Sequence, residues 1–383
     1  MTASKVAIQL ISTGGVYGAE RALLELAGYL SEHGWESHVV ALEGAGARAL
    51  ADRATSQGLL AETFVAGGRL GLLPMISRLR CLLRRYPDAI MHSHGYKPDI
   101  LLSWLGVPRR MGCLATCHNW ISDTRKLQLL EALDKRALRH FDRVVAVSPD
   151  IARELVTSGV SARRVSIINN GIRVPQAQDD SKSNVRAAFG IPDGGKLIVQ
   201  IGRLARSKRI DLLLQAVSRL PDELQAYVLL AGEGEQRDFL GGLAGRLGLE
   251  RRVHFCGYRG DVGRLLAAAD VLALSSEREG LPIVILEAMA LRCPIVTTRV
   301  GAIPDVLGDG HDAWIVAPND PDALQRAISD VLERPEVAAL RAANAYDRYV
   351  RLYSRDAMGA RYLELYENVW TSRQRSRYLA ARA

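Results

Sequence analysis

The sequence contains few cysteines and few aromatic residues, and it has no long apolar run. Its five cysteines are an odd number spread over both halves of the 383 residues, which is typical of a reducing cytosol and argues against a disulfide framework. Aromatic residues make up 6% of the chain, so the interleaved stacking platforms of a nucleic-acid-binding protein are lacking. No apolar stretch approaches the length that spans a bilayer. These absences favour a globular, cytoplasmic protein that does not bind nucleic acid.

The length and charge of the chain narrow the remaining classes. A chain of 383 residues exceeds one ordinary hydrophobic core, so two domains are expected. The formal net charge of +8 favours anionic partners, whether nucleotide phosphates, acidic lipid surfaces or nucleic acid, and does not by itself choose among them. The segment from Met1 to Lys5 is too short for a signal peptide, and the residues from Val6 onward are predicted to form a first strand.

Short β-branched runs alternate with helical patterns along the whole chain. This alternation is typical of βαβ units around a parallel sheet, so we predict two doubly wound, Rossmann-like α/β domains that face a central cleft. Ligands of such sheets bind beyond the carboxyl ends of the strands. The expected strands are 6–12, 37–41, 90–92, 112–117, 143–147 and 165–168 in the first half, and 197–201, 226–231, 253–255, 271–274 and 294–297 in the second.

A polar, proline-containing segment from Val174 to Ser181 suits a linker between the two domains. The predicted domains are therefore residues 1–175 and residues 176–360. The last residues, 361–383, are expected to form a helical tail, with the option of crossing back to the first domain.

The segment from Ser275 to Ala290 reads as a polar loop after a strand, followed by an apolar helix. Glu279 lies in the loop and Glu287 one to two turns into the helix, where each carboxylate can accept hydrogen bonds from vicinal hydroxyls of a sugar or ribose. Backbone N–H groups at the helix start suit an anion. The residues at this start are Gly280, Leu281, Pro282 and Ile283. The segment therefore predicts a sugar-nucleotide site; the alternative is a solvated loop carboxylate beside a helix-surface glutamate.

A glycine loop with Gly14, Gly15 and Tyr17 follows the first predicted strand and opens a helix. Glycine allows a ligand to approach the backbone closely, and the helix start supplies N–H donors. A dinucleotide-binding loop is the alternative, with Glu43 near the position of a ribose-binding acid. The spacing Gly-Gly-x-x-Gly differs from the dinucleotide fingerprint, which argues against a dehydrogenase.

Three loops after strands of the second domain also carry polar residues. Arg203 offers a planar fork and Lys208 a point charge, which together suit a diphosphate, although a basic surface loop is the alternative. Gly232 follows the next strand, and the backbone around Tyr258 and Arg259 could pair with a base edge. A plain turn explains either of these last two segments nearly as well.

Histidines end two strands of the first domain. His118 is expected to point into the cleft, and His94 is a cleft-lining candidate; a hydrogen-bonded structural histidine is the alternative for each. Cys113 and Cys117 near His118 suggest zinc, but they share one face of a strand, so buried thiols are the better interpretation. The only Asp-x-Asp pattern, Asp320-Pro321-Asp322, fits a helix start better than a magnesium site. No metal site is predicted.

In combination, these motifs resemble the retaining glycosyltransferases of family four, which have two Rossmann-like domains in the GT-B architecture. The motifs that carry the resemblance are the Gly14-Gly15 loop, Thr116-Cys117-His118, Val145-Ala146-Val147-Ser148, Asn170-Gly171, Gly202-Arg203-Leu204 with Lys208, and the run from Glu279 to Glu287. Three positions depart from the family pattern and bear on acceptor geometry. They are Arg209 where glycine is frequent, Asn119 where aspartate is common, and Asp305 in place of a glutamate.

The resemblance implies an acceptor-binding first domain and a donor-binding second domain. It implies that Glu279 binds hydroxyls of the donor sugar, that Glu287 holds the ribose, and that Arg203 and Lys208 neutralise the diphosphate. Gly15 would approach the phosphates, and His118 would touch the donor sugar beside the reacting carbon. The residues expected to act in catalysis are His118, Glu279, Arg203 and Lys208. Those considered for the acceptor are Tyr17, His94 and Asn119.

The expected reaction is the retaining transfer of a hexose from a nucleoside-diphosphate sugar, of the UDP-sugar or GDP-mannose type, to a glycan or lipid-linked acceptor. A front-face route without metal or cofactor is expected, because no carboxylate is forced to lie under the anomeric carbon. Surface polysaccharide or glycolipid biosynthesis is the expected setting. A sugar-nucleotide epimerase of the same fold and a non-catalytic nucleotide-binding protein remain as alternatives.

A basic, apolar segment from Leu70 to Tyr86 suggests contact with an acidic membrane surface, at the inner face of the cell membrane. The arginine-rich end of the chain also favours contact with an acidic surface. The alternative is a helix that packs its apolar stripe into the core and solvates its other face.

Overall fold

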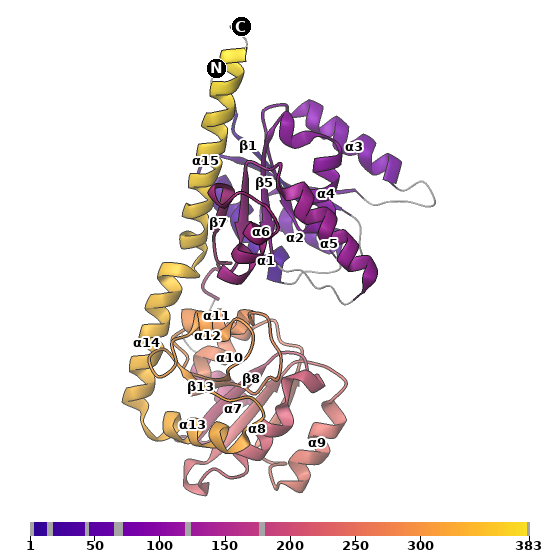
Figure 1. The fold of residues 1–383 in the computed structure, drawn as a ribbon. Coiled ribbons are helices and arrows are strands. Elements are labelled where there is room, and N and C mark those ends of the chain that lie inside the picture. Colours follow the sequence, from indigo (N-terminus) through magenta and orange to yellow (C-terminus); the bar gives the residue numbers. More distant parts are fainter. Residues whose placement is uncertain are drawn as a thin grey trace. The chain divides into compact units, whose positions relative to one another are not determined.

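The computed structural model describes residues 4–13, 18–42, 46–64, 72–118, 124–175 and 181–380 (Figure 1). The chain divides into two compact units. Unit 1 comprises residues 1–173 and 355–383, and unit 2 comprises residues 174–354. The sequence predicted domains at residues 1–175 and 176–360, with a helical tail at 361–383. The chain re-enters unit 1 at Arg355, so the last helix, α15 (Arg355–Ala380), belongs to unit 1.

Unit 1 contains a seven-stranded parallel sheet with the order β3-β2-β1-β4-β5-β6-β7. The strands are β1 (Val6–Ser12), β2 (Glu36–Leu42), β3 (Leu60–Phe64), β4 (Ile90–His94), β5 (Gly112–Cys117), β6 (Arg143–Ala146) and β7 (Val165–Ile167). Successive side chains of β1 point to opposite faces of the sheet. Ile8 and Leu10 pack into the core on one face, and Ala7 and Ile11 pack into two clusters on the other face. Burial on both faces is why β1 is mostly apolar, with Gln9 as a buried polar residue at its centre.

The helices of unit 1 fill both faces of this sheet. They are α1 (Gly18–Glu32), α2 (Ala47–Ser56), α3 (Leu72–Arg85), α4 (Tyr96–Trp104), α5 (Arg125–Leu138), α6 (Pro149–Thr157) and α15, with short 3₁₀ turns at Val107–Arg109 and Ala162–Arg164. The N-cap hydroxyls of Thr124 and Ser148 accept hydrogen bonds from backbone N–H groups in the first turns of α5 and α6.

The helix α15 packs against α1 and against the middle of the sheet. Glycine permits two of these contacts: a Cβ at Gly359 would lie 2.3 Å from the ring of Tyr29, and a Cβ at Gly112 would lie 2.9 Å from Val369. Charged residues fix the helix at both ends. Arg355 donates to Glu32 at 2.6 Å, and Arg373 donates to both carboxylate oxygens of Asp142, at 2.9 and 2.8 Å.

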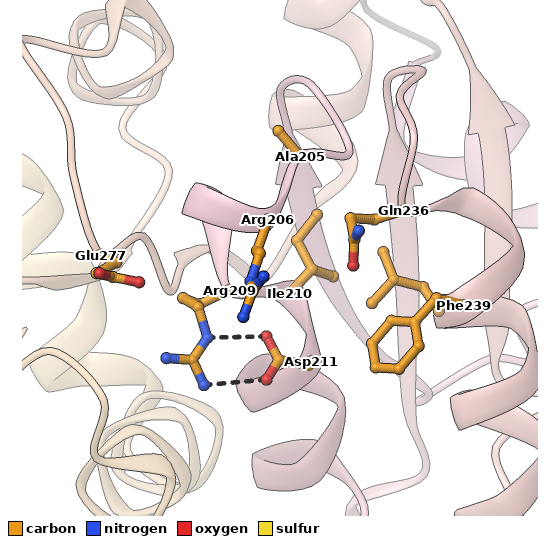
Figure 2. A pocket seen from close by; sticks show the side chains of 9 residues that line it. Ala205, Arg206, Arg209, Ile210, Asp211, Gln236, Phe239 and Glu277 are labelled. Carbon is orange, nitrogen blue, oxygen red and sulfur yellow. Dashed lines mark hydrogen bonds and ion pairs between the residues drawn. The ribbon is translucent and has the colours of Figure 1, made fainter.

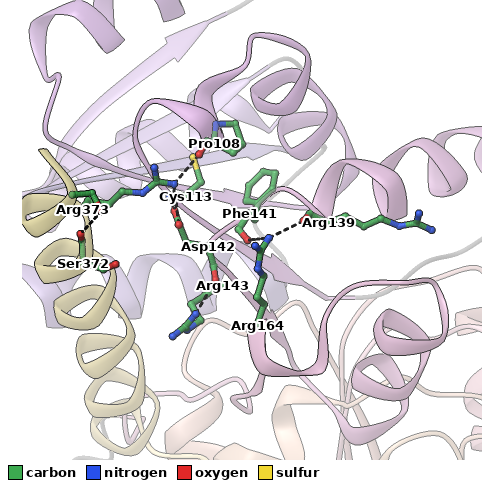
Figure 3. A network of polar contacts seen from close by, with 10 residues as sticks. Pro108, Cys113, Arg139, Phe141, Asp142, Arg143, Arg164, Ser372 and Arg373 are labelled. Carbon is green, nitrogen blue, oxygen red and sulfur yellow. Dashed lines mark hydrogen bonds and ion pairs between the residues drawn. The ribbon is translucent and has the colours of Figure 1, made fainter. Parts of the chain in front are cut away.

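Figure 3 shows the second of these anchors. Arg373 of α15 also donates to the carbonyl of Pro108 at 2.7 Å, while Asp142 accepts from the backbone N–H of Cys113 at 2.8 Å. The end of α15 is therefore joined to the start of β5 and to the loop before β6. The arginines near the end of the chain act in part as structural anchors of unit 1.

Unit 2 contains a six-stranded parallel sheet with the order β10-β9-β8-β11-β12-β13. Its strands are β8 (Lys196–Ile201), β9 (Ala226–Ala231), β10 (Val253–Gly257), β11 (Val271–Leu274), β12 (Ile295–Thr298) and β13 (Trp314–Val316). Its α-helices are α7 (Ser181–Ala188), α8 (Ile210–Val217), α9 (Arg237–Arg246), α10 (Val262–Ala268), α11 (Ile283–Ala290), α12 (Ile303–Val306), α13 (Pro321–Glu333) and α14 (Pro335–Leu352). Two 3₁₀ turns lie at Arg206–Lys208 and Asp222–Leu224.

The predicted fold class, two Rossmann-like parallel α/β units, is confirmed. Two strands were not predicted, namely β3 and β13. Both lie at sheet edges, and both are short. In β3, three of the five residues are charged or small, and only Phe64 is buried, so the apolar pattern is too weak to indicate a strand.

The basic segment predicted from Leu70 begins, in the described residues, as α3 at Leu72. Its apolar stripe packs into the core of unit 1 through Met75, Ile76, Leu79 and Leu82. The arginines of α3 are exposed. The core-packing interpretation therefore accounts for the stripe, and the charged face and Leu73 are exposed at the surface. Within the described residues, none of the helices combines the length and the apolar character needed to cross a membrane.

Candidate functional site

The strand order of unit 2 places its predicted donor-binding loops next to one another. β8 lies between β9 and β11, so the chain leaves β8 on one side and later returns on the other. Ligands of doubly wound sheets bind at such a reversal, beyond the carboxyl ends of the strands. Lys208 follows β8 and Glu279 follows β11, so both lie at this point.

Lys208 and Glu279 are in direct contact. The Nζ atom of Lys208 donates to Oε1 of Glu279 at 2.5 Å, and the hydroxyl of Ser276 donates to the same oxygen at 2.6 Å. The side chain of Glu279 is 9% exposed and that of Lys208 is 23% exposed. A carboxylate this deeply buried needs a charged partner, and Lys208 supplies it. Two loops 71 residues apart thus form one charged pair.

Hydrogen bonds hold these two loops in a fixed position. The hydroxyl of Ser275 donates to the carbonyl of Lys208 at 2.9 Å, and the N–H of Glu277 donates to the carbonyl of Ser207 at the same distance. The buried hydroxyl of Thr298, at the end of β12, donates to the carbonyl of Ser276 at 2.6 Å. The site is therefore supported by three neighbouring strands.

Gly301 supports the Glu279 loop from the following connection. Its φ is +54°, and a Cβ there would lie 2.1 Å from the carbonyl oxygen of Glu279. The N–H of Ala302 donates to the carbonyl of Gly280 at 3.1 Å. Any other residue at position 301 would push the Glu279 loop away, so this glycine serves close backbone contact. Asp305, one of the departures from the family pattern, lies in the short helix α12 that follows.

The other predicted donor residues lie elsewhere in unit 2. Arg203 is 73% exposed and donates to Glu235 at 3.1 Å, so its guanidinium is held at the surface by a screened pair. Glu287 lies in α11 and is buried. The helix start before it carries Gly280 to Ile283, and its first N–H groups have no acceptor within the helix.

Backbone packing explains the glycine after β9. A Cβ at Gly232 would lie 1.9 Å from the carbonyl oxygen of Gly202. The N–H of Leu204 donates to the carbonyl of Glu233 at 2.9 Å. Tyr258 is 80% exposed, and Arg259 donates to both oxygens of Asp261, at 2.8 and 2.6 Å. The Asp261 carboxylate raises the pKa of Arg259, so that side chain is already paired and its backbone is the part left for a base edge.

Arg209 adopts a backbone conformation that favours glycine, with φ at +46°. Its guanidinium donates to both oxygens of Asp211 at 3.1 Å (Figure 2). It also donates to the side-chain oxygen of Asn319. The hydrogen bond from Arg209 to Asp211 raises the pKa of Arg209. The left-handed conformation explains why glycine suits this position, and the pairing with Asp211 offsets part of the strain.

A cavity of about 530 Å³ opens beside this arginine. Residues from the loop after β8, from α8, from α9 and from the loop after β11 line it (Figure 2). Arg206, Gln236, Phe239 and Glu277 contribute side chains. Its lining, within the described residues, includes neither Lys208 nor Glu279, so the cavity borders the charged pair rather than containing it.

In unit 1, β1 and β4 form the corresponding strand reversal. The predicted residues Gly14, Gly15, Tyr17 and Asn119 lie outside the described residues. The residues on either side of the glycine loop are described: the hydroxyl of Thr13 donates to Glu20 at 2.5 Å, and both side chains are buried. This contact joins the two ends of the predicted loop.

The two predicted histidines of unit 1 lie side by side at the ends of β4 and β5. The Nδ1 atom of His94 and the Nε2 atom of His118 are 3.4 Å apart. His94 is 4% exposed, and its Nε2 atom lies 2.9 Å from Oε1 of Gln9. Burial lowers the pKa of His118 to about 4 and that of His94 well below its ordinary value, so both rings are neutral at pH 7.

The sequence also suggested two places where a metal could bind. Asp320 caps α13 by accepting from the N–H of Ala323 at 2.8 Å, with Pro321 in the first turn. Cys113 and Cys117 are free and buried, and burial raises the pKa of both thiols. Among the residues that the structure describes, no group of three His, Cys, Asp or Glu side chains is arranged to hold a metal ion.

Some residues of these sites were not found from the sequence. Ser276 donates to Glu279 and Thr298 donates to the carbonyl of Ser276, while Gln9 contacts His94. Two tyrosines of α15, Tyr366 and Tyr362, contact the neighbouring His92. Ser275-Ser276 directly follows a strand, which was an available signal. Tyr362 and Tyr366 lie four residues apart, and this spacing places them on one face of a helix. The strand that this face contacts could not be read from their spacing.

Comparison with known proteins agrees with this geometry. The family model described as Glycosyltransferase Family 4 matches residues 16–174, and the model described as Glycosyl transferases group 1 matches residues 181–348. With two Rossmann-like sheets, these matches define a glycosyltransferase of the GT-B architecture. The chain belongs to the family-four glycosyltransferases.

Individual relatives and solved structures extend over most of the chain. The lipopolysaccharide core biosynthesis glycosyltransferase LpsE of Rhizobium meliloti is 29% identical over 350 residues, which are 91% of this chain and 95% of that protein. The crystal structure of HepE from Anabaena in complex with UDP has a TM-score of 0.82 at 22% identity and covers 95% of this chain and 100% of its own. A glycosyltransferase from Rickettsia africae has a TM-score of 0.81 at 18% identity, over 96% of this chain and 98% of its own.

Proposed function

We propose that this glycosyltransferase transfers a hexose, with retention of configuration, from a nucleoside-diphosphate sugar to a glycan or a lipid-linked acceptor. The observation that carries the proposal is the Lys208–Glu279 pair at the strand reversal of unit 2. It joins a cation suited to a diphosphate with a carboxylate suited to sugar hydroxyls. A site of this kind matches both halves of a sugar nucleotide.

Each residue of the pair has a separate role in the proposal. Lys208 and the more exposed Arg203 balance the charge of the diphosphate, and the first N–H groups of α11 add to this. Glu279 accepts hydrogen bonds from hydroxyls of the hexose, and Glu287 binds the ribose. When Lys208 turns toward the diphosphate, Ser276 still donates to Glu279, so the carboxylate keeps its orientation.

The demanding step is the departure of the nucleoside diphosphate from the anomeric carbon. The bond from this carbon to the leaving oxygen breaks, and the acceptor oxygen bonds to the carbon on the same face. The acceptor proton passes to an oxygen of the leaving phosphate. Lys208 and Arg203 stabilise the negative charge that develops there, a contribution of about 3 kcal/mol for a well-placed donor. This positive charge makes a metal ion and other cofactors unnecessary in the proposal.

The donor and acceptor classes are supported by the relatives. HepE was crystallised with UDP and with UDP-glucose, which supports a UDP-sugar, and a GDP-mannose type of donor is tested beside it. LpsE acts in lipopolysaccharide core biosynthesis by its description, which supports a surface glycan or glycolipid as the acceptor. We place the reaction in the cytoplasm.

Association with the inner face of the membrane is a further part of the proposal. It rests on the exposed arginines of α3, because the apolar stripe of that helix is used by the core. Flotation of the protein with liposomes that contain acidic lipid should show binding that salt reverses. Equal absence of binding to acidic and neutral liposomes would remove this part and leave the enzymatic proposal unaffected.

The experiment that tests the enzymatic proposal uses a panel of UDP-, GDP- and ADP-sugars with a radiolabelled hexose. One donor should raise the melting temperature and release its nucleoside diphosphate while the label passes to a glycan or lipid fraction. Glu279→Gln should lower kcat/KM about 100-fold. The matched control is Glu223→Gln, an exposed glutamate before β9 at the opposite end of the sheet, which should leave kcat/KM unchanged.

Two outcomes would contradict the proposal. Label that remains on the nucleotide as an isomeric sugar would indicate an epimerase. Turnover that is equal in Glu279→Gln and in Glu223→Gln would remove Glu279 from the site. Analysis of the anomeric configuration of the product by NMR then tests retention separately.

A further inference from the structure

A buried chain of hydrogen bonds connects α15 to His118 within unit 1. Its central residue is Gln9 of β1, which is fully buried. The Nε2 atom of Gln9 donates to the hydroxyl of Tyr366 at 2.8 Å, and its Oε1 atom lies 2.9 Å from Nε2 of His94. The chain ends at His118, whose Nδ1 atom is buried and has no partner among the described residues. None of these residues has a role in the reaction as proposed above.

The donors and acceptors along this chain determine one another. Oε1 of an amide only accepts, so His94 must carry its proton on Nε2. Since the ring of His94 is neutral, its Nδ1 atom is then a bare acceptor. The contact between His94 and His118 therefore requires a proton on Nε2 of His118, and Nδ1 of His118 is left as a bare acceptor.

A second arm of the network accommodates this orientation of the Gln9 amide. The hydroxyl of Tyr366 accepts from Gln9, so its own proton is available for Nδ1 of His92, which lies 2.9 Å away. His92 then donates from Nε2 to the hydroxyl of Thr116 at 2.8 Å, and Thr116 contacts Tyr362 at the same distance. Burial keeps Tyr366 protonated by raising its pKa. Every described member of this arm is satisfied in this arrangement.

The opposite arrangement reverses every bond. If the Gln9 amide were turned over, its Nε2 atom would donate to His94, and His94 would donate from Nδ1 to His118. His118 would then present an N–H at Nδ1 instead of a lone pair. The two arrangements thus differ in what His118 offers a ligand, and the orientation of one amide separates them.

We propose that Gln9, held by Tyr366, is a positioning residue that fixes the proton of His118 on Nε2, so that Nδ1 of His118 accepts a hydrogen bond from a hydroxyl of the donor sugar. The contact with the sugar rests on the proposed function, whereas the position of the proton does not. In this arrangement His94 acts through its neighbour and does not itself bind the acceptor, because both of its ring nitrogens are occupied.

The direct test is NMR of the full-length protein labelled with ¹⁵N-histidine and free of ligand. Long-range ¹H–¹⁵N correlations separate protonated from bare ring nitrogens, and His118→Gln assigns the signals of His118 among the eight histidines. At pH 7.5, His118 should show a protonated Nε2 and a bare Nδ1. A protonated Nδ1 in the ligand-free protein would overturn the proposal, whatever the activity of the enzyme.

Two matched pairs of variants test the role of Gln9 and its anchor. Tyr366→Phe removes the hydroxyl that holds Gln9, whereas Tyr362→Phe removes the hydroxyl of the other arm, four residues away on the same helix. Gln9→Met removes the amide, and Gln200→Met changes a buried glutamine of β8 in unit 2. Tyr366→Phe and Gln9→Met should give mixed tautomers of His118, and the two control variants should leave a single tautomer. The same His118 signals in all four folded variants would overturn the proposal.

Binding measurements separate positioning from structural damage. Gln9→Met should weaken binding of the nucleotide sugar about tenfold, the effect of one lost hydrogen bond to a sugar hydroxyl, and should leave binding of the free nucleoside diphosphate unchanged. Equal weakening of both ligands would indicate a structural effect and contradict the proposal. If mixed tautomers appear but no sugar nucleotide binds the parent protein, the hydrogen-bond chain stands and the proposed function fails.

Discussion

The two units hold their polar site residues in opposite ways. In unit 2, Lys208 and Arg203 are paired with carboxylates and remain partly exposed, so a ligand can exchange for one partner. In unit 1, His92 and His94 are buried and His118 is partly buried, and all three are bonded to neutral side chains. In the proposed reaction, Lys208 and Arg203 of unit 2 exchange their carboxylate partners for the diphosphate of the donor. Unit 1 is built to keep a neutral, directional network in one arrangement.

The largest effect expected from this comparison concerns α15. A chain that ends at Ser354 loses the helix and with it the buried side chains of Met358, Tyr362, Tyr366 and Val369. Each contributes about 2 kcal/mol of burial, and the sum is comparable to the whole stability of a domain. Unit 1 should unfold while unit 2 stays folded. Hydrogen exchange measured by mass spectrometry should show lost protection in the strands of unit 1, including β1, β4 and β5, and retained protection in the strands of unit 2.

Protection that persists in β1, β4 and β5 of the shortened chain would show that unit 1 does not depend on α15. Loss of protection in both units would remove the contrast between them. A chain shortened after Arg377 is the control, because it keeps the four buried residues and the Arg373 anchor.

The dependence of unit 1 on α15 also shows which contacts could not be predicted from the sequence. The parallel α/β pattern and the loops after strands were readable, because most buried strands are largely apolar and polar residues directly follow them. Lys208 and Glu279 could therefore be placed in one site although they are far apart in the chain. The contact between Tyr366 and Gln9 joins residues 357 positions apart, through a helix whose partner the sequence pattern does not specify. Edge strand β3 was missed because its side chains are mostly not buried.

The second prediction concerns acid stability. Burial lowers the pKa of His92 to about 3 and that of His118 to about 4, from an ordinary 6.5. The unfolded chain therefore binds more protons, and stability is lost as the pH falls below 6.5. Each of these histidines should lower the free energy of unfolding of unit 1 by about 2 kcal/mol between pH 7 and pH 5. Hydrogen exchange at the two pH values should show the loss in unit 1.

His92→Gln should remove part of the decrease in the free energy of unfolding of unit 1 between pH 7 and pH 5. Unit 2 has one histidine with a lowered pKa, His254, which is only partly buried, and it should change less. An equal loss of protection in both units on acidification would contradict the assignment of acid sensitivity to the buried histidines.

The smallest expected effect comes from a buried acid pair in unit 1. Asp99 and Asp134 are both fully buried, and burial followed by the charge of Asp134 raises the pKa of Asp99 well above its ordinary value. The folded state therefore binds a proton more tightly, and stability is lost as the pH rises above the ordinary value of 3.8. Asp99→Asn keeps an acceptor for Ser93 and should raise the free energy of unfolding at pH 8 by about 1 kcal/mol. Urea denaturation of Asp99→Asn and of the parent protein at pH 8 measures this difference in the free energy of unfolding.

The gain from Asp99→Asn should shrink as the pH is lowered toward 4, in the opposite direction to the histidine effect. Asp142→Asn serves as the contrast, since Asp142 is paired with Arg373 and the loss of this pair should destabilise unit 1. A gain from Asp99→Asn that does not vary with pH would contradict the proposed protonation of Asp99.

The central claim is that the nucleoside diphosphate of the donor binds at the Lys208–Glu279 pair of unit 2. Isothermal titration of UDP and GDP into the full-length protein tests this claim most directly, with Lys208→Ala compared with Lys196→Ala. Lys196 is the first residue of β8, whereas Lys208 lies in the loop that follows the other end of β8. We expect one nucleotide to bind, with an affinity that falls about tenfold or more in Lys208→Ala and is unchanged in Lys196→Ala. Equal affinity of both variants for that nucleotide would contradict the account.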